Sequence, residues 1–141
     1  MEADTVTKLC SDLYRDPNHE GWNDYDLATL PKRELVFLCR IMGIPTYGNA
    51  ETITIRLLTC RIVRKELSPF GDDPAAVVPV FKRSRLHWMC QQAKLWKSGN
   101  KYSLSVVLLR WRNECRHKGQ AFLNECIEAT KASDQQLTLK L

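Results

Sequence analysis

The side chains in this sequence best suited to a chemical role are basic, and they gather in two stretches of the chain. Residues 30–68 hold seven lysines and arginines against three acids, and residues 82–119 hold ten against one. Lysine and arginine neutralise phosphates and release counterions, so such clusters bind nucleic acid without any base contact. A solvated helix surface that binds nothing can have the same composition. The position of the basic residues along the chain therefore has to be considered as well.

The second stretch carries its charge on two expected helices and the turn between them. Its members are Lys82, Arg83, Arg85, Lys94, Lys97, Lys101, Arg110, Arg112, Arg116 and Lys118. We expect them to form a polyanion-binding surface. Trp88 and Tyr102 lie among them and could stack on unpaired bases. Trp96 and Trp111 follow helical spacing, which is more typical of a core.

Other kinds of site have little support in the sequence. It contains no phosphate-cradling glycine loop, nucleophile elbow, zinc-protease motif or paired carboxylates, so we predict no enzyme and no cofactor. His87, Cys90, Cys115 and His117 offer four ligand types that suit zinc. Residues two apart on a helix point to different sides, however, so Cys115 and His117 are poorly placed for one metal. We therefore predict no metal site.

The first basic stretch begins with an expected amphipathic helix. Pro31 is suited to its start, because the missing N–H of proline costs nothing there, and Gly43 is suited to its end. The residues spaced to share its apolar face are Leu35, Leu38, Cys39 and Met42.

A connector at residues 43–48, Gly-Ile-Pro-Thr-Tyr-Gly, separates this helix from a second one. Pro45 fixes its own φ and restrains Ile44, so the chain cannot continue as a helix. Asn49 is suited to cap the second helix, and Glu51 lies near its positive end. The side chains expected to share a face of that helix are Ile53, Leu57, Cys60 and Arg64.

Residues 30–58 resemble the SAP-type motif, also called the SAF box, a short helix–extended loop–helix module that binds DNA. The resemblance rests on the connector at residues 43–48, on Ile53 and on Arg56-Leu57-Leu58. The motif usually reads Gly-Leu-Pro-Thr-small-Gly, followed soon by a basic residue. Here Tyr47 replaces the small polar residue, and Ala50 stands where a basic residue is common.

The resemblance implies binding to duplex DNA with a loose, often AT-rich, preference. The start of the second helix would present backbone N–H groups to a phosphate, with cations on either side. The DNA-binding residues expected there are Lys32, Arg33, Arg40, Tyr47, Gly48, Asn49 and Arg56. The residues expected to extend this footprint are Lys82, Arg83, Arg85, Lys94, Lys97, Lys101, Arg110 and Arg112.

The C-terminal half predicts two more helices, separated at Ser98-Gly99-Asn100. The first, within residues 82–96, has an apolar face made of Leu86, Met89, Cys90, Ala93 and Trp96. The second, capped by Ser103, has an apolar face made of Leu104, Val107, Leu108, Trp111 and Cys115. A DNA-binding helix–turn–helix would place the second helix in the major groove, but its first exposed residues are serine and valine. An antiparallel helical hairpin is therefore favoured. Gly119 either ends the second helix or lies inside a longer one.

The fold predicted from these elements is all-α, in four regions, and the apolar residues of the third region favour one compact body over two independent ones. Residues 1–26 form a helix over 5–14, capped by Asp4 or Thr5, and an acidic arm anchored by Trp22 and Tyr25. Residues 27–68 form the SAP-like module, and residues 69–81 a proline-rich connector. Residues 82–141 form the basic helical region. Whether the second and fourth regions share one core is left open.

Six cysteines, none in a C-x-x-C pair, indicate reduced core residues of an intracellular protein. The acids near the N-terminus do not suit a secretory signal, and no apolar stretch is long enough to span a bilayer. The function predicted is non-enzymatic binding of duplex DNA. The alternatives are a helical adaptor whose basic face docks an acidic protein, and binding of RNA or single strands through Trp88 and Tyr102.

Overall fold

The computed structural model describes residues 7–96 and 98–139, with residues 132–139 as backbone only. The described part contains helices and no strand, which confirms the predicted all-α class. The helices are α1 (Lys8–Arg15), α2 (Asp24–Leu27), α3 (Lys32–Met42), α4 (Ala50–Leu67), α5 (Pro74–Val77), α6 (Arg83–Gln92) and α7 (Lys101–Leu139).

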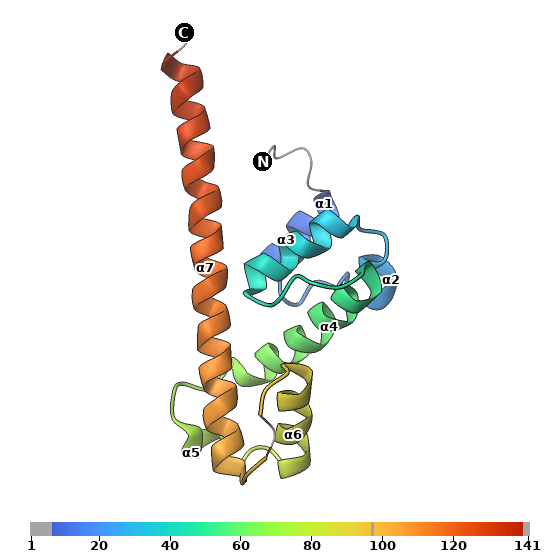
Figure 1. Ribbon diagram of the computed structural model, residues 1–141, viewed down its shortest axis with the longest axis vertical. Helices are drawn as coiled ribbons and strands as arrows, with labels where there is room; N and C mark the ends of the chain where they lie inside the picture. The colour runs from blue at the N-terminus through green and yellow to red at the C-terminus, as the bar shows by residue number, and fades with distance from the viewer. Residues whose placement is uncertain (1–6, 97, 140–141) are drawn as a thin grey trace.

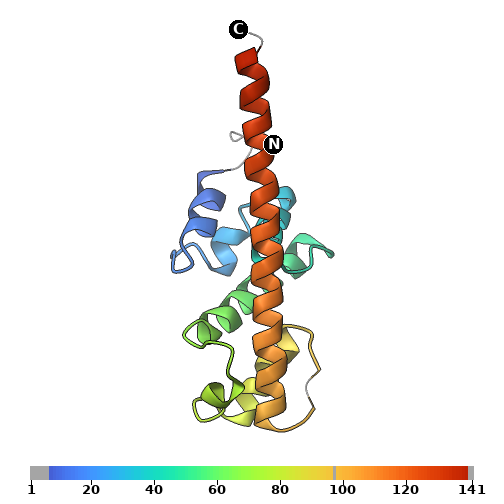
Figure 2. The same ribbon diagram turned by 90° about the vertical axis from the view of Figure 1, so that its left-hand side faces the viewer.

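The long helix α7 forms the axis of the molecule, and the other helices pack around its N-terminal part (Figures 1 and 2). At a rise of about 1.5 Å per residue, its 39 residues span about 58 Å. The helices α1, α2 and α3 gather near the middle of α7, while α5 and α6 lie near its start. The helix α4 runs between the two groups. The C-terminal end of α7 continues past the other described helices.

One hydrophobic core joins the two helical regions. Its buried side chains come from nearly every helix, and they include Leu13, Leu38, Leu57, Leu86 and Leu108. Each such side chain contributes about 1.5–3 kcal/mol when it is removed from water. Buried side chains of residues 27–68 and of residues 82–115 therefore belong to the same core cluster.

The helices α3 and α7 cross with their backbones in contact. Gly119 is buried inside α7, and a Cβ atom at this position would overlap the carbonyl oxygen of Ile41. The reciprocal contact is made by Gly43, where a Cβ atom would overlap the carbonyl oxygen of Cys115. Gly119 is thus an interior residue of a longer helix, and it permits the close approach of α3 and α7.

The elements predicted around the connector are confirmed. Leu35, Leu38 and Cys39 are buried on α3, and Gly43 ends this helix in the left-handed conformation, with φ of 73°. Asn49 caps α4 by accepting a hydrogen bond from the Thr52 N–H at 2.8 Å. These signals lie within a few residues of the helix ends that they specify. The spacing along the sequence was therefore sufficient to predict where α3 ends and where α4 begins.

The predicted antiparallel hairpin of α6 and α7 is wrong. The helix α7 starts beside the start of α6, so both helices run in the same direction (Figure 1). Arg83 Nε donates to the Gly99 carbonyl at 3.0 Å, which places the start of α6 beside the start of α7. Further along, Cys90 Sγ lies 4.0 Å from the Leu104 carbonyl oxygen. The segment between the two helices decides their relative direction, and helical periodicity carries no information about that direction.

Two helix caps differ from those predicted. The start of α7 is capped by Asn100, whose Oδ1 accepts from the Ser103 N–H at 2.9 Å, so the helix begins before the expected cap. The start of α1 is capped by Thr7, whose hydroxyl accepts from the Cys10 N–H at 3.2 Å. Asp4 and Thr5, the caps expected for this helix, lie outside the described residues.

The aromatic side chains divide between core and surface in a way that spacing predicted only in part. Trp22 folds back as predicted, with its indole N–H donating to the Leu13 carbonyl at 3.1 Å, and Trp111 is buried. Tyr25 is 83% exposed, so it is not an anchor. Trp96 is 73% exposed, because α6 ends at Gln92 and the helical register that would turn it inward is lost.

The proline-rich segment at residues 69–81 packs against the helices, as predicted for a strap. Asp73 caps the short helix α5, in which Val77 is fully buried. The rings of Phe70 and Phe81 lie 5.8 Å apart between centroids. Val80, which was also expected to pack inward, is 59% exposed.

The cysteines behave as small apolar core residues, as predicted. All six thiols are free; five are buried, and Cys126 is half-buried. Burial raises the pKa of Cys10 to about 12, with a contribution from the charge of Glu34. Burial also raises the pKa of Cys90 to about 11. These thiols are therefore protonated at neutral pH.

Candidate nucleic-acid interface

The connector between α3 and α4 is fixed at its first turn by backbone hydrogen bonds. The Gly43 N–H donates to the Arg40 carbonyl at 3.1 Å, and the Ile44 N–H donates to the Cys39 carbonyl at 3.0 Å. This pairing satisfies the last carbonyls of α3, and it requires the left-handed conformation that glycine provides. The chain therefore leaves α3 in a single, defined direction.

Arg56 holds the rest of the connector in place. Its Nη1 donates to the carbonyls of Pro45 and Tyr47, both at 2.8 Å. Its guanidinium also lies 4.4 Å from the centroid of the Tyr47 ring. The structure thus brings Arg56 and Tyr47 together as expected, but it uses Arg56 to position the backbone.

The start of α4 lies directly after the connector. Gly48 has a φ of 111°, which lets the chain turn into the helix, and Asn49 caps it. Tyr47, Gly48 and Asn49 are all exposed, as a ligand-contacting turn requires. The N–H of Thr52 is already satisfied by Asn49, so only the N–H groups before it remain for a ligand.

The charged surface of α3 is basic. The residues of this helix that are exposed are Lys32, Arg33 and Arg40, and its one acid, Glu34, is buried. Arg40 and Lys118 line a cavity of about 330 Å³ together with residues 43–45 of the connector. The crossing of α3 with α7 therefore adds a cation to the connector that spacing along the chain does not place there.

Arg112 is not part of a binding surface, contrary to the prediction. Its side chain is 1% exposed, and Nη1 donates to the carbonyls of Leu67 and Phe70 at 2.9 and 2.7 Å. Nη2 donates to the Gly71 carbonyl at 3.0 Å. Burial lowers the pKa of Arg112. This arginine caps the C-terminal end of α4, where helix carbonyls lack intrahelical partners.

Two further arginines of the predicted footprint are engaged within the protein. Arg85 pairs with Glu66, with Nε at 3.1 Å from Oε2, and its guanidinium lies 4.2 Å from the Trp88 ring centroid. Arg83 is exposed but donates to the Gly99 carbonyl. Trp88 is half-buried, and Arg85 lies over one face of its ring.

The remaining predicted cations lie apart from the connector. Lys82 and Lys101 flank the starts of α6 and α7, at the end of the molecule away from α3 (Figure 1). Lys94 and Arg110 are exposed, whereas Lys97 lies outside the described residues. The structure therefore separates the predicted cations on α3 from Lys82 and Lys101, which lie at the opposite end of the molecule.

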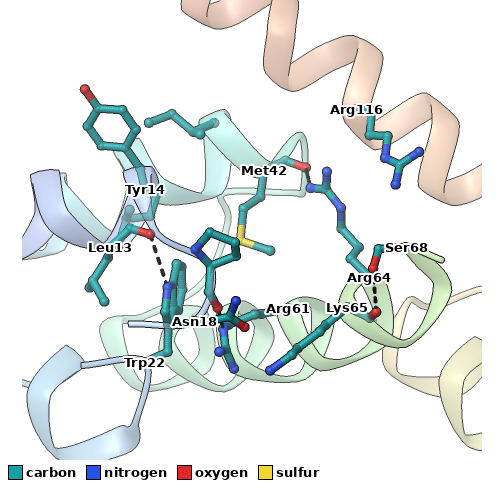
Figure 3. Close-up of a pocket in the computed structure, with 13 residues that line it drawn as sticks. Leu13, Tyr14, Asn18, Trp22, Met42, Arg61, Arg64, Lys65, Ser68 and Arg116 are labelled. Carbon is teal, nitrogen blue, oxygen red and sulfur yellow. Dashed lines mark hydrogen bonds between the residues drawn. The ribbon is translucent and has the colours of Figure 1, made fainter. Parts of the chain in front are cut away.

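Sequence-based interpretation missed a second basic concavity on the molecule. Arg61, Arg64 and Lys65 on α4 face a cavity together with Arg116 of α7 (Figure 3). Arg61 Nε donates to the Pro17 carbonyl at 2.8 Å. The only sequence signal for this site was three basic residues within one turn and a half of α4. Helical spacing placed Arg64 on the apolar face of that helix and Arg61 beside it.

Neither a metal site nor a membrane span is present in the described part of the chain. Among the residues whose positions are given, no three His, Cys, Asp or Glu side chains are grouped to hold a metal ion. None of the helices described is both long and apolar enough to cross a membrane.

Comparisons with known proteins do not identify a relative. The chain matches no protein family, no curated protein sequence and no solved structure. The resemblance of residues 30–58 to the SAP-type motif therefore stays a prediction.

Proposed function

We propose that this protein binds duplex DNA without enzymatic activity, through phosphate contacts made by α3, the connector and the adjoining part of α7. The observation that carries the proposal is the composition of the α3 surface, where all the exposed residues are cations. These are Lys32, Arg33 and Arg40, and Lys118 of α7 lines the same cavity as Arg40.

These cations are available to an external anion. The ion pairs among the described residues are those of Arg85 and Arg112, and neither lies on α3. Arg33 and Arg40 are seven residues apart, so they lie on one face of the helix two turns apart. Charges that lack a protein partner release counterions when they meet phosphates, which is the main source of sequence-independent affinity.

The resemblance to the SAP-type motif supports the same part of the chain. It points to the connector and the start of α4, and the exposed turn of Tyr47, Gly48 and Asn49 lies there. A helix start with open N–H groups is favourable for a phosphate. The AT-rich preference comes from the resemblance alone, and it is part of this proposal.

The test is fluorescence anisotropy with a labelled AT-rich duplex, a GC-rich duplex and a single strand, across a range of salt concentrations. Four phosphate contacts predict a slope of log K against log salt of about −3.6. The double variant Arg33→Gln/Arg40→Gln should reduce the magnitude of this slope by about two units, because two contacts are lost.

A charge-matched comparison locates the footprint. The double variant Lys82→Gln/Lys101→Gln removes the same charge at the opposite end of the molecule and should change the slope by less. Equal losses from the two pairs would contradict a footprint centred on α3. No duplex binding at low salt would refute the proposal as a whole.

A helical adaptor is the second candidate, and the free end of α7 favours it. The C-terminal end of this helix extends past the other described helices (Figure 1), and Ile127 of α7 is 49% exposed. A protein partner that packs against this end of α7 would bury that apolar side chain. Displacement of the duplex by polyglutamate at equal charge concentration would favour an acidic protein as the partner of the basic surface.

A further inference from the structure

A cavity of about 430 Å³ lies between the α1–α2 loop, α3, α4 and α7 (Figure 3). Its size falls within the range of about 300–1,000 Å³ that is usual for small-molecule sites. Part of its wall is apolar and is formed by Leu13, Trp22, Leu38 and Met42. The indole N–H of Trp22 donates to the Leu13 carbonyl at 3.1 Å, so this wall is held in position without a ligand.

The rest of the wall is strongly basic. Arg61, Arg64, Lys65 and Arg116 line the cavity, and no aspartate or glutamate does. Both ion pairs formed by the described residues lie elsewhere in the molecule. A concave surface with four cations and no acid attracts anions, because its low-dielectric walls focus the positive potential.

Arg64 is fixed at the centre of this basic wall. Its Nη1 donates to the Met42 carbonyl at 2.6 Å, which orients the guanidinium and leaves other N–H groups for a ligand. Arg64 and Arg116 reach toward the same space from α4 and α7 (Figure 3). Burial lowers the pKa of Arg64, and the charge of Arg116 lowers it further. Two like charges thus approach each other where no carboxylate separates them.

We propose that this cavity binds a small organic phosphate monoester with an apolar or aromatic body. The phosphate would lie between Arg64 and Arg116, and the body would lie against Trp22 and Leu38. A monoester carries a charge of about −1.5 to −2 and offers three acceptor oxygens, so it matches several cations better than a carboxylate does. Arginine binds such groups with paired N–H donors.

This site is separate from the surface proposed to bind DNA. Arg116 and Lys118 are two residues apart on α7, so their side chains point to different sides of the helix. On α3, Arg40 contributes to the connector cavity, while Leu38 and Met42 contribute to this one. The phosphate backbone of a duplex also offers no apolar group that would pack against the apolar wall of this cavity. The inference therefore holds whether or not the protein binds DNA.

The experiment is a titration of the full chain with 1-naphthyl phosphate, followed by calorimetry and by the ¹H–¹⁵N resonance of the Trp22 indole. That resonance is assigned with the variant Trp22→Phe. Inorganic phosphate and 1-naphthol test the two halves of the ligand separately. We expect saturable binding of 1-naphthyl phosphate, a shift of the Trp22 resonance, and weaker binding of both partial probes.

Two variants and one control test the basic wall. Arg116→Gln and Lys65→Gln change exposed side chains outside the core, and each should weaken binding by roughly tenfold, because a charged hydrogen bond is lost. Lys131→Gln removes the same charge elsewhere on α7 and should leave binding unchanged. The proposal is overturned if 1-naphthyl phosphate does not bind at millimolar concentration, if 1-naphthol binds as tightly, or if Lys131→Gln has the same effect as Lys65→Gln.

Discussion

Replacing Gly119 with alanine tests whether the α3–α7 crossing organises this fold. Inside an exposed helix, the change would stabilise the protein by about 1 kcal/mol, because alanine is the better helix former. Here the new Cβ atom would overlap the carbonyl oxygen of Ile41, which belongs to the backbone of another helix. A backbone atom cannot rotate away, so α7 must move away from α3 and lose packing on both sides.

The magnitude follows from the competition between these two effects. Overpacking in a tight site costs about 1–3 kcal/mol or more, and a backbone obstacle puts Gly119→Ala at or above the upper end of this range. After the gain in helix propensity, we expect a net loss of about 2 kcal/mol. For a chain of this size, such a loss lowers the midpoint of thermal unfolding by roughly 6–10 °C.

The assay is thermal unfolding followed by circular dichroism at 222 nm, with Gly71→Ala as the matched control. Nothing lies within 4 Å of a Cβ atom at Gly71, so the control should be neutral or slightly stabilising. Gln120→Ala, at an exposed neighbour on α7, measures any general effect of alanine in this helix. A midpoint for Gly119→Ala at or above that of the wild type would refute the close crossing.

Two further predictions concern buried polar groups. Arg112→Leu leaves the carbonyls of Leu67, Phe70 and Gly71 without a donor and should cost about 3 kcal/mol, measured by chemical denaturation. Burial raises the thiol pKa of Cys10 from 9.0 to about 12, so its contribution to stability is complete below pH 9 and is lost as the pH rises toward 12. The free energy of unfolding should therefore fall from pH 8 to pH 11, and replacing Cys10 with alanine should reduce that fall; an undiminished fall would contradict this role.

The sequence predicted the local structure around the connector with little error. Proline, glycine and a capping asparagine act on residues at most four positions away, so their spacing specifies where α3 ends and where α4 begins. Helical periodicity likewise identified buried faces such as Leu35 and Leu38. It failed at Trp96, because the period was extended past the residue at which α6 ends.

The sequence could not decide which cations are free. Composition counts Arg112 and Arg40 alike, yet one is buried against the end of α4 and the other is exposed on α3. The hydrogen bonds of Arg112 join residues more than 40 positions apart, so no local spacing reports them. Arg112 therefore does not belong to the candidate DNA-binding surface, because it donates to the carbonyls at the end of α4.

The sequence by itself therefore determined the helical class, the turn between α3 and α4, and the excess of positive charge. The tertiary structure alone decided the common direction of α6 and α7, the position of Arg40 and Lys118 at one cavity, and the cavity lined by Arg64 and Arg116. The physical reason is the range of the interactions. Caps and periodicity act within one or two helical turns, whereas a binding surface forms where distant helices meet, and the crossing at Gly119 sets that meeting.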